Sequence, residues 1–174
     1  MQEYDQSRYL LPRIFSFFLK KMGKGRPFVL PGDIKNSKSL LFIDSGDVID
    51  ILFAAPVINF FSNNHPGIRT TILVDSKYSE IVKGIMKVNR IITYNRDQLS
   101  FFKVDYMALV RKLRRQDIDL LIMLSRRFSL ERYLLAFACG AVLRIGFAHP
   151  LAFPFMNCEI RTSEDEYEGK KMSG

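Results

Sequence analysis

Residues 38–61, KSLLFIDSGDVIDILFAAPVINFF, decide the fold of this chain. The run at 39–43 is apolar without polar alternation, which is typical of a strand covered on both faces. The turn-forming tetrapeptide DSGD follows at 44–47, and residues 48–63 form a mostly apolar segment of helical length. In open α/β sheets a strand, a small-residue turn and a helix start build a ligand crevice, because the first N–H groups of the helix point into it. We therefore expect the binding site at this turn.

The rest of the chain alternates short β-rich runs with segments of helical length. The pattern predicts strands at residues 69–74, 90–94, 119–124 and 143–147, and helices at 78–85, 106–116 and 130–138. Ser76 is available as a helix cap, and Gly140 stands where a helix end favours glycine. Such alternation implies right-handed crossovers and an α/β fold, a Rossmann-like open parallel sheet with helices on both faces. Neither the Pro- and Phe-rich residues 149–157 nor the polar residues 161–174 offer an apolar run for another strand.

Composition limits the classes of partner. The chain has 174 residues, 48 % of them hydrophobic and 25 % charged, which is enough apolar residue for one core. The formal net charge of +8 favours an anionic partner such as nucleic acid, a membrane surface or a phosphorylated substrate. Cys139 and Cys158 lack metal-ligand spacing and are expected to be reduced thiols in a cytosolic protein. No apolar run approaches the ~20 residues of a membrane span, and no secretory signal is expected.

Residues 1–37 are predicted to form an extension, a basic amphipathic helix and a linker. Apolar residues recur at helical spacing, with basic residues at other positions: Leu10, Ile14, Phe18 and Met22 against Arg8, Arg13, Lys20, Lys21 and Lys24. One interpretation is a helix that packs this stripe on the domain. The other is a helix that lies on an anionic membrane surface through residues 8–24. Glycines and prolines between 23 and 32 mark the linker.

The absence of known fingerprint motifs excludes several kinds of site. A dinucleotide fingerprint needs G-x-G-x-x-G after the first strand, but the turn holds only Gly46, so a nicotinamide or flavin domain is excluded. A P-loop is also absent. His65 and His149 lie in loop-like contexts and suggest no Ser-His-Asp set.

Carboxylates and arginines gather at the predicted carboxyl ends of two strands. Asp44, Asp47 and Asp50 follow the first strand, and the pentapeptide SRRFS at 125–129 follows the fourth. Ends of parallel strands open on the same side of the sheet, so both groups should meet. Arginine pairs suit carboxylate or phosphate groups of a ligand, although a solvated loop pair is the alternative. Ser129 is the cap of the next helix or a ligand contact.

Four segments resemble the N-terminal half of a bacterial glycosyltransferase of the heptosyltransferase family: LLFIDSGDVIDILFAAP, HPGIRTTILVDSKYSEIVKG, VNRIITYN and DIDLLIMLSRRFSLERYLLAFACGAVLRIGF. The resemblance covers residues 38–147 and rests on the order and spacing of the segments. It implies lipopolysaccharide core assembly by an enzyme with two Rossmann-like domains. The first binds the acceptor and carries the general base, and the second binds the nucleotide-sugar donor. It also implies direct, inverting transfer without a metal.

The resemblance implies Asp50 or Asp47 as the base. The family places a Gly-Asp pair six residues before the helix proline. Here Asp50 lies six residues before Pro56, but Ile49 replaces the glycine, and the intact pair ends at Asp47. The substrate-binding residues it suggests are Ser45, Gly46, Arg126, Arg127 and Ser129. A purely structural alternative is a cap, with Asp47 at the N-cap and Asp50 at N3.

The donor-binding half is absent from this chain, so it is not expected to turn over alone. We expect residues 38–160 to be the acceptor-side domain and 161–174 to begin an interdomain linker or tail. The expected partners are an anionic glycolipid or sugar acceptor and the missing donor domain, with no cofactor. The expected location is cytoplasmic, peripheral at the inner face of the bacterial inner membrane. One alternative is a non-catalytic module that binds an anionic glycolipid or a protein. A nucleic-acid binder is disfavoured, because the chain lacks an aromatic-basic platform.

Overall fold

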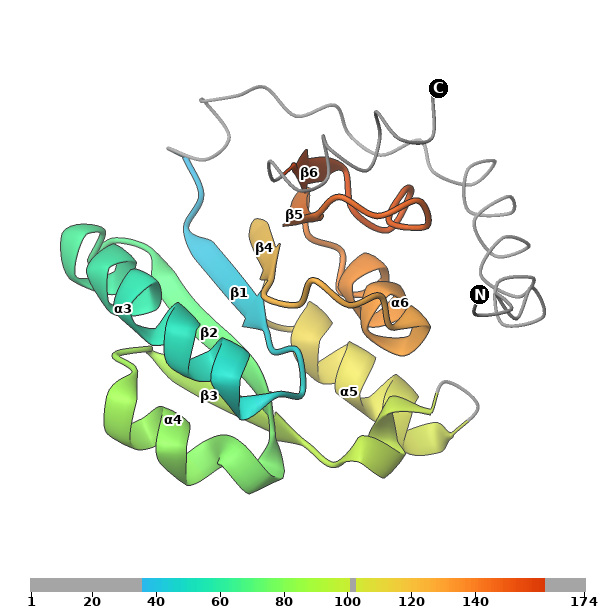
Figure 1. Ribbon diagram of the computed structural model, residues 1–174, viewed down its shortest axis with the longest axis horizontal. Coiled ribbons are helices and arrows are strands. Elements are labelled where there is room, and N and C mark those ends of the chain that lie inside the picture. The colour runs from blue at the N-terminus through green and yellow to red at the C-terminus, as the bar shows by residue number, and fades with distance from the viewer. Residues whose placement is uncertain (1–35, 101–102, 162–174) are drawn as a thin grey trace, which may run out of the picture.

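The structure is a computed structural model that describes residues 36–100 and 103–161 (Figure 1). The predictions for the N-terminal helix, for most of its linker and for most of the tail fall on residues 1–35 and 162–174, outside the described residues.

Six strands form one sheet in the order β3-β2-β1-β4-β5-β6. They are β1 (Ser39–Ile43), β2 (Arg69–Asp75), β3 (Arg90–Tyr94), β4 (Leu120–Met123), β5 (Leu143–Phe147) and β6 (Cys158–Ile160). Every neighbouring pair is parallel. Phe42 of β1 stands opposite Ile72 on one side and Ile122 on the other, so β1 is a central strand.

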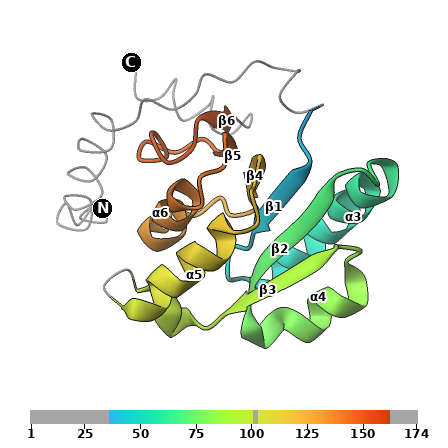
Figure 2. The same ribbon diagram turned by 180° about the vertical axis from the view of Figure 1, so that it is seen from behind.

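Helices cover both faces of this sheet. They are α3 (Val48–Asn64), α4 (Ser79–Ile85), α5 (Val104–Arg114) and α6 (Leu130–Ala138), with the short 3-10 turns η1 (Ser76–Tyr78) and η2 (Arg96–Leu99). The two views in Figures 1 and 2 show α3 and α4 on one face and α5 and α6 on the other. The predicted α/β, Rossmann-like parallel sheet is therefore confirmed.

The central strand contributes to two separate cores. Leu40 and Phe42 pack with α3 and α4, whereas Leu41 and Ile43 pack with α5 and α6. All five residues of β1 are buried, as the absence of polar alternation in its sequence predicted. Burial on both faces fixes the position of the turn that follows β1.

One strand was missed from the sequence. β6 has three residues, pairs with β5 alone among the described strands, and is partly exposed at the edge of the sheet. It is a strand because of its main-chain hydrogen bonds to β5, and its sequence contains no apolar run that would have predicted it. The segment before it packs Ala152, Phe155 and Met156 into the core beside α5 and α6.

The sequence predicted residues at the end of one helix and at the start of another, and only the first prediction is confirmed. Gly140 has a φ of +87°, which confirms the glycine at the end of α6. The prediction that Ser76 caps the helix after β2 was wrong, because Ser76 begins η1 and Asp75 caps that turn by accepting from the Lys77 N–H. The residue at the N-cap of α4, Tyr78, makes no side-chain cap bond.

Candidate functional site

A cleft lies beyond the ends of two neighbouring strands, β1 and β4, whose following connections lead to opposite faces of the sheet. β1 leads through residues 44–47 to α3 on one face, and β4 leads through residues 124–129 to α6 on the other (Figure 1). In open α/β sheets this topological switch point leaves a crevice beyond the carboxyl ends of the strands. The cleft has a volume of about 1010 Å³. The N-termini of both α3 and α6 border it, which favours anionic groups inside.

The cleft contains every site residue predicted from the sequence. Ser45, Gly46, Asp47 and Asp50 line it from the first connection and the start of α3, and Arg126, Arg127 and Ser129 line it from the second. The structure thus brings together two groups that lie about eighty residues apart in the chain. Their catalytic and binding roles stay predictions.

The two connections are built alike. Ser45 Oγ accepts a hydrogen bond from the Asp47 N–H at 3.1 Å, and Ser125 Oγ accepts one from the Arg127 N–H at 3.0 Å. Each serine therefore closes a tight turn directly after its strand. These turns aim the following residues at the cleft.

Asp47 is tied into the helix cap. Its Oδ1 accepts from the Ile49 N–H at 3.0 Å, at the N-cap position of α3. Its own N–H goes to Ser45, so Asp50 does not complete the reciprocal capping box. The cap interpretation therefore holds for Asp47 and fails for Asp50.

Asp50 lies in the first turn of α3, half-buried at the edge of the cleft. Within residues 36–100 and 103–161 its carboxylate makes no hydrogen bond or ion pair. The oxygens of Asp50 are therefore not engaged by any described residue, and they border the cleft.

Asp44 belongs to the interior and does not line the cleft. Its carboxylate accepts from the Asp75 N–H at 2.9 Å and from the Tyr94 hydroxyl at 2.6 Å, and Arg132 Nε lies 3.7 Å away. Burial raises the pKa of Asp44 above its ordinary value of 3.8, although these three partners each favour the charged form. Asp44 therefore joins β1, β2, β3 and α6 beneath the cleft floor.

Arg132 connects this buried network to the cleft. Its Nη2 donates to the Tyr94 oxygen at 2.9 Å, and the guanidinium lies against Gly46. Gly46 has a φ of +77°, and a Cβ there would collide with Arg132 Nη2. Glycine is required at this position for both reasons.

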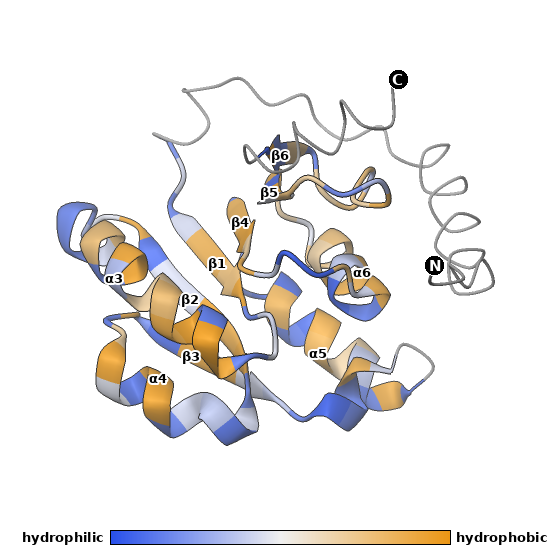
Figure 3. Cartoon of the chain, in the orientation of Figure 1, coloured by the Kyte–Doolittle hydropathy of each residue, from blue (hydrophilic) through white to orange (hydrophobic). Residues whose placement is uncertain are grey.

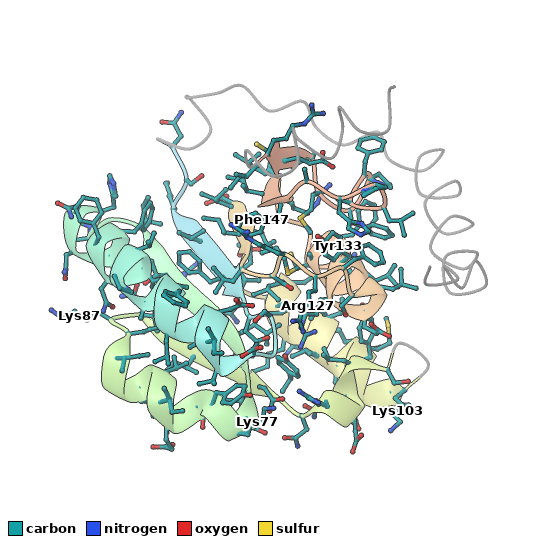
Figure 4. The ribbon with its side chains drawn as sticks, in the orientation of Figure 1. Lys77, Lys87, Lys103, Arg127, Tyr133 and Phe147 are labelled. Atoms are coloured by element: carbon teal, nitrogen blue, oxygen red, sulfur yellow. The ribbon has the colours of Figure 1, made fainter. Side chains whose placement is uncertain are left out.

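The second connection carries the cations that face the cleft. Within residues 36–100 and 103–161 the guanidinium of exposed Arg127, labelled in Figure 4, makes no hydrogen bond or ion pair. Arg126 lies over the Phe147 ring, 5.3 Å from its centroid. Phe128 anchors this connection, stacking on His149 at 4.9 Å. Ser129 stands at the N-cap of α6, but its hydroxyl bonds to Glu131 and makes no cap bond.

Sequence reasoning missed Arg96, Glu131, Arg132 and Tyr94. Arg96 also lines the cleft and pairs with Asp75 at 3.5 Å. The sequence offered one indication for Arg132, since it lies in the first turn of a helix whose N-terminus was predicted to open on the site. Nothing in the sequence indicated that Tyr94, fifty residues from Asp44, would bond to it.

Neither a metal cluster nor a membrane-spanning helix is present among the described residues. No group of three or more His, Cys, Asp or Glu side chains in the described part of the chain is arranged to hold a metal ion. No helix within residues 36–100 and 103–161 combines the length and the apolar character needed to cross a membrane.

No protein-family model matches the chain, and no curated protein matches it. Solved structures do. A glycosyl transferase family 9 protein from Veillonella parvula DSM 2008 aligns with a TM-score of 0.57 and 17% identity, over 71% of this chain and 35% of that one. ADP-heptose lps heptosyltransferase II from E. coli aligns with a TM-score of 0.59 and 16% identity, over 72% and 36%. E. coli heptosyltransferase WaaC with ADP aligns with a TM-score of 0.56 and 17% identity, over 74% and 43%.

At these identities the similarity is one of fold. The chain spans only 35% to 43% of the length of these glycosyltransferases. Its parallel sheet, with the cleft at the switch point, therefore has the fold of a part of the heptosyltransferases and of a family 9 glycosyl transferase.

Proposed function

We propose that this chain is the acceptor-binding part of a glycosyltransferase of the heptosyltransferase type. The observation that carries the proposal is Asp50, whose carboxylate has no partner in the described chain and borders the cleft that Arg127 lines from the opposite connection. The fold similarity to heptosyltransferases supports the reaction class. The acceptor would be a lipopolysaccharide-core sugar or a related anionic glycolipid.

Asp50 would act as the general base. As the acceptor oxygen bonds to the anomeric carbon of the donor, its proton passes to Asp50 and the bond from that carbon to the nucleoside diphosphate breaks. Attack opposite the leaving group inverts the anomeric centre. The proposed displacement is direct and does not involve a metal ion. Asp47 suits the role less, because its carboxylate already accepts from the Ile49 N–H.

The cationic side of the cleft would hold the acceptor. Arg127 offers a guanidinium with no partner in the described chain, and the N-termini of α3 and α6 add partial positive charge. Phosphate or carboxylate groups on the acceptor fit this arrangement, because charge-assisted hydrogen bonds to arginine are short and directional. The turn of Ser45 and Gly46 would face the sugar hydroxyls.

The donor would bind outside this chain. The similar structures are more than twice as long as the part this chain covers. An ADP-heptose-like donor would therefore contact a second domain, and the chain alone would bind acceptor without transferring sugar. The expected place of action is the cytoplasmic face of the bacterial inner membrane.

Calorimetric titration of the full chain with an acidic, phosphorylated core sugar and with its neutral parent sugar tests the proposal. We expect saturable binding of the acidic sugar, competition by inorganic phosphate, and no release of ADP from ADP-heptose. Asp50→Asn should retain binding, because it removes a charge without removing a contact to the anion. Equal affinity for the neutral sugar, or none for either, would overturn the proposal.

A non-catalytic module is the second candidate, favoured by Ile49. This residue lines the cleft with a relative exposure of 56%, at the position where the family has glycine. Such a module would bind the same anionic glycolipid or a protein partner. The two candidates separate when a donor domain is supplied, since only an enzyme would then lose turnover on Asp50→Asn.

A further inference from the structure

Helix α3 is apolar on every side, yet half of it is uncovered. Ile51, Ala55 and Ile58 are buried against the sheet. The opposite side is exposed within the described structure, with relative exposures of 78% for Phe53 and 67% for Val57. Figure 3 shows hydrophobic colour along this helix. A helix that is hydrophobic all round is normally buried, so the uncovered side of α3 is a candidate docking surface.

The uncovered side continues into a groove on the sheet. α3 and α4 cover the strands β1 to β3 on this face, and no described helix covers β4 to β6 there. A groove of about 550 Å³ results, lined by Phe53 and Val57 from α3 and by Ile122, Leu124, Phe147 and Ile160 from the strands and the residue after β4. These side chains form an apolar bed beside α3, and two groups of opposite charge, Asp50 of α3 and Arg126 after β4, border it.

We infer that the N-terminal segment of this same chain, residues 8–24, docks as an amphipathic helix in the groove between α3 and β4–β6. These residues lie outside the described structure, so only their sequence enters the argument. Leu10, Ile14, Phe18 and Met22 recur at i, i+4 spacing and give one apolar stripe. Pro12 suits the first turn of a helix, so a regular helix from Pro12 to Lys24 would be about 20 Å long, somewhat shorter than the 17-residue α3. The basic residues of the segment would face solvent.

The connection to the sheet permits this docking. The residues from 25 to 38 contain Gly25, Pro27, Pro31 and Gly32 and lead directly into β1, which pairs with β4 and packs against α3. Extended chain covers at most about 3.5 Å per residue, so this linker reaches any part of the groove. Tethering also gives the segment an effective concentration on the order of millimolar, which neither a second copy nor a membrane has.

The absence of tryptophan from the chain provides the test. Phe53→Trp in the full chain places the only indole in the groove, and its emission maximum and quenching by acrylamide report whether it is covered. We expect a blue-shifted emission and several-fold weaker quenching than for the control Val104→Trp, at a position that is 84% exposed on α5. Ile14→Gln with Phe18→Gln should abolish the protection, whereas Arg13→Gln with Lys20→Gln should preserve it.

Other occupants give different results. An indole at position 53 that is quenched like the one at 104 in the monomeric full chain would overturn the inference. Protection that survives the stripe substitutions and grows with protein concentration, together with a doubled mass in light scattering, would assign the groove to a second copy. Protection that develops only with anionic vesicles would assign it to a membrane. Each of these outcomes is independent of sugar binding, so the proposed function could fail while this inference stands.

Discussion

The Nη2 atom of Arg132 stands where a side chain at Gly46 would begin. One residue lies on α6 and the other on the connection after β1, so their contact locks the two halves of the switch point together. The same guanidinium bonds to Tyr94, which bonds to the buried Asp44. The cleft floor therefore rests on a single network that four elements share.

Gly46→Ala should lower the free energy of unfolding by about 1–3 kcal/mol. A left-handed φ costs an L-residue about 1 kcal/mol or more, and the new Cβ must also displace Arg132. Urea denaturation measures the change. Gly84→Ala is the matched control, because a methyl group there would meet no other atom within 4 Å and α4 gains up to about 1 kcal/mol from alanine. Equal effects of the two substitutions would contradict the assigned contact.

Tyr94→Phe should destabilise the protein more at neutral than at acid pH. A carboxyl whose pKa is higher in the folded chain contributes stability that is complete below its unfolded pKa and is lost as the pH rises through the folded pKa. Burial places Asp44 in this class, and the Tyr94 hydroxyl opposes the shift by bonding to the carboxylate. Its removal raises the pKa of Asp44 further and makes the loss of stability at neutral pH larger.

Urea denaturation of Tyr94→Phe between about pH 4 and pH 7 should show a cost that grows to about 1–3 kcal/mol. Tyr106→Phe is the control, since that hydroxyl donates its hydrogen bond to the main-chain carbonyl of Glu131 at 3.2 Å and not to a carboxylate. Its cost should not change with pH. A constant cost for Tyr94→Phe would show that its bond to Asp44 does not respond to ionisation.

Asp47→Ala and Asp50→Ala should separate the cap from the unpartnered carboxylate. The first removes the bond to the Ile49 N–H and should cost about 1 kcal/mol of unfolding free energy. The second should change stability by less than about 0.5 kcal/mol, because better helix propensity offsets the lost charge–dipole attraction. Thermal and urea unfolding give both values. The reverse ranking would make Asp50 the structural residue.

Arg127→Ala should weaken the binding of a sugar phosphate by about tenfold or more. A charge-assisted hydrogen bond contributes about 1.5–3 kcal/mol, and Arg127 has no partner in the described chain to release before binding. Calorimetry at fixed ionic strength measures the affinity. Arg115→Ala, beyond the exposed end of α5, removes the same charge away from the cleft and serves as the control. Equal losses would reduce the role of Arg127 to general attraction.

The secondary structure could be predicted because its determinants are local. The runs that became β1 to β5 are apolar or β-branched and end at turn residues, and the helices follow with 3.6-residue periodicity or helical length. β6 lacked any such mark, since its three residues depend on pairing with β5. Parallel alternation predicted that strand ends meet, but it does not give the strand order.

The site was predictable only where it follows directly from a strand end. Asp47, Asp50 and Arg127 each lie within a few residues of β1 or β4. Tyr94 and Arg96 reach the same region because β3 leads to η2 beside the cleft. No local sequence pattern predicts this placement of β3 and η2. Which of Asp47 and Asp50 caps α3 also needed the structure, because it depends on which carboxylate the Ile49 N–H reaches.

The segment from Ser125 to Ser129 is held by Ser125 at its start and by the stacking of Phe128 on His149 near its end. Arg126 and Arg127 project between these two anchors, and neither anchor belongs to the sheet ladder. Residues 126 and 127 can therefore be exchanged within a pentapeptide that keeps Ser125 and Phe128 while both anchors stay in place. Under the proposed function, such exchanges would change which acceptor is bound without repacking either core.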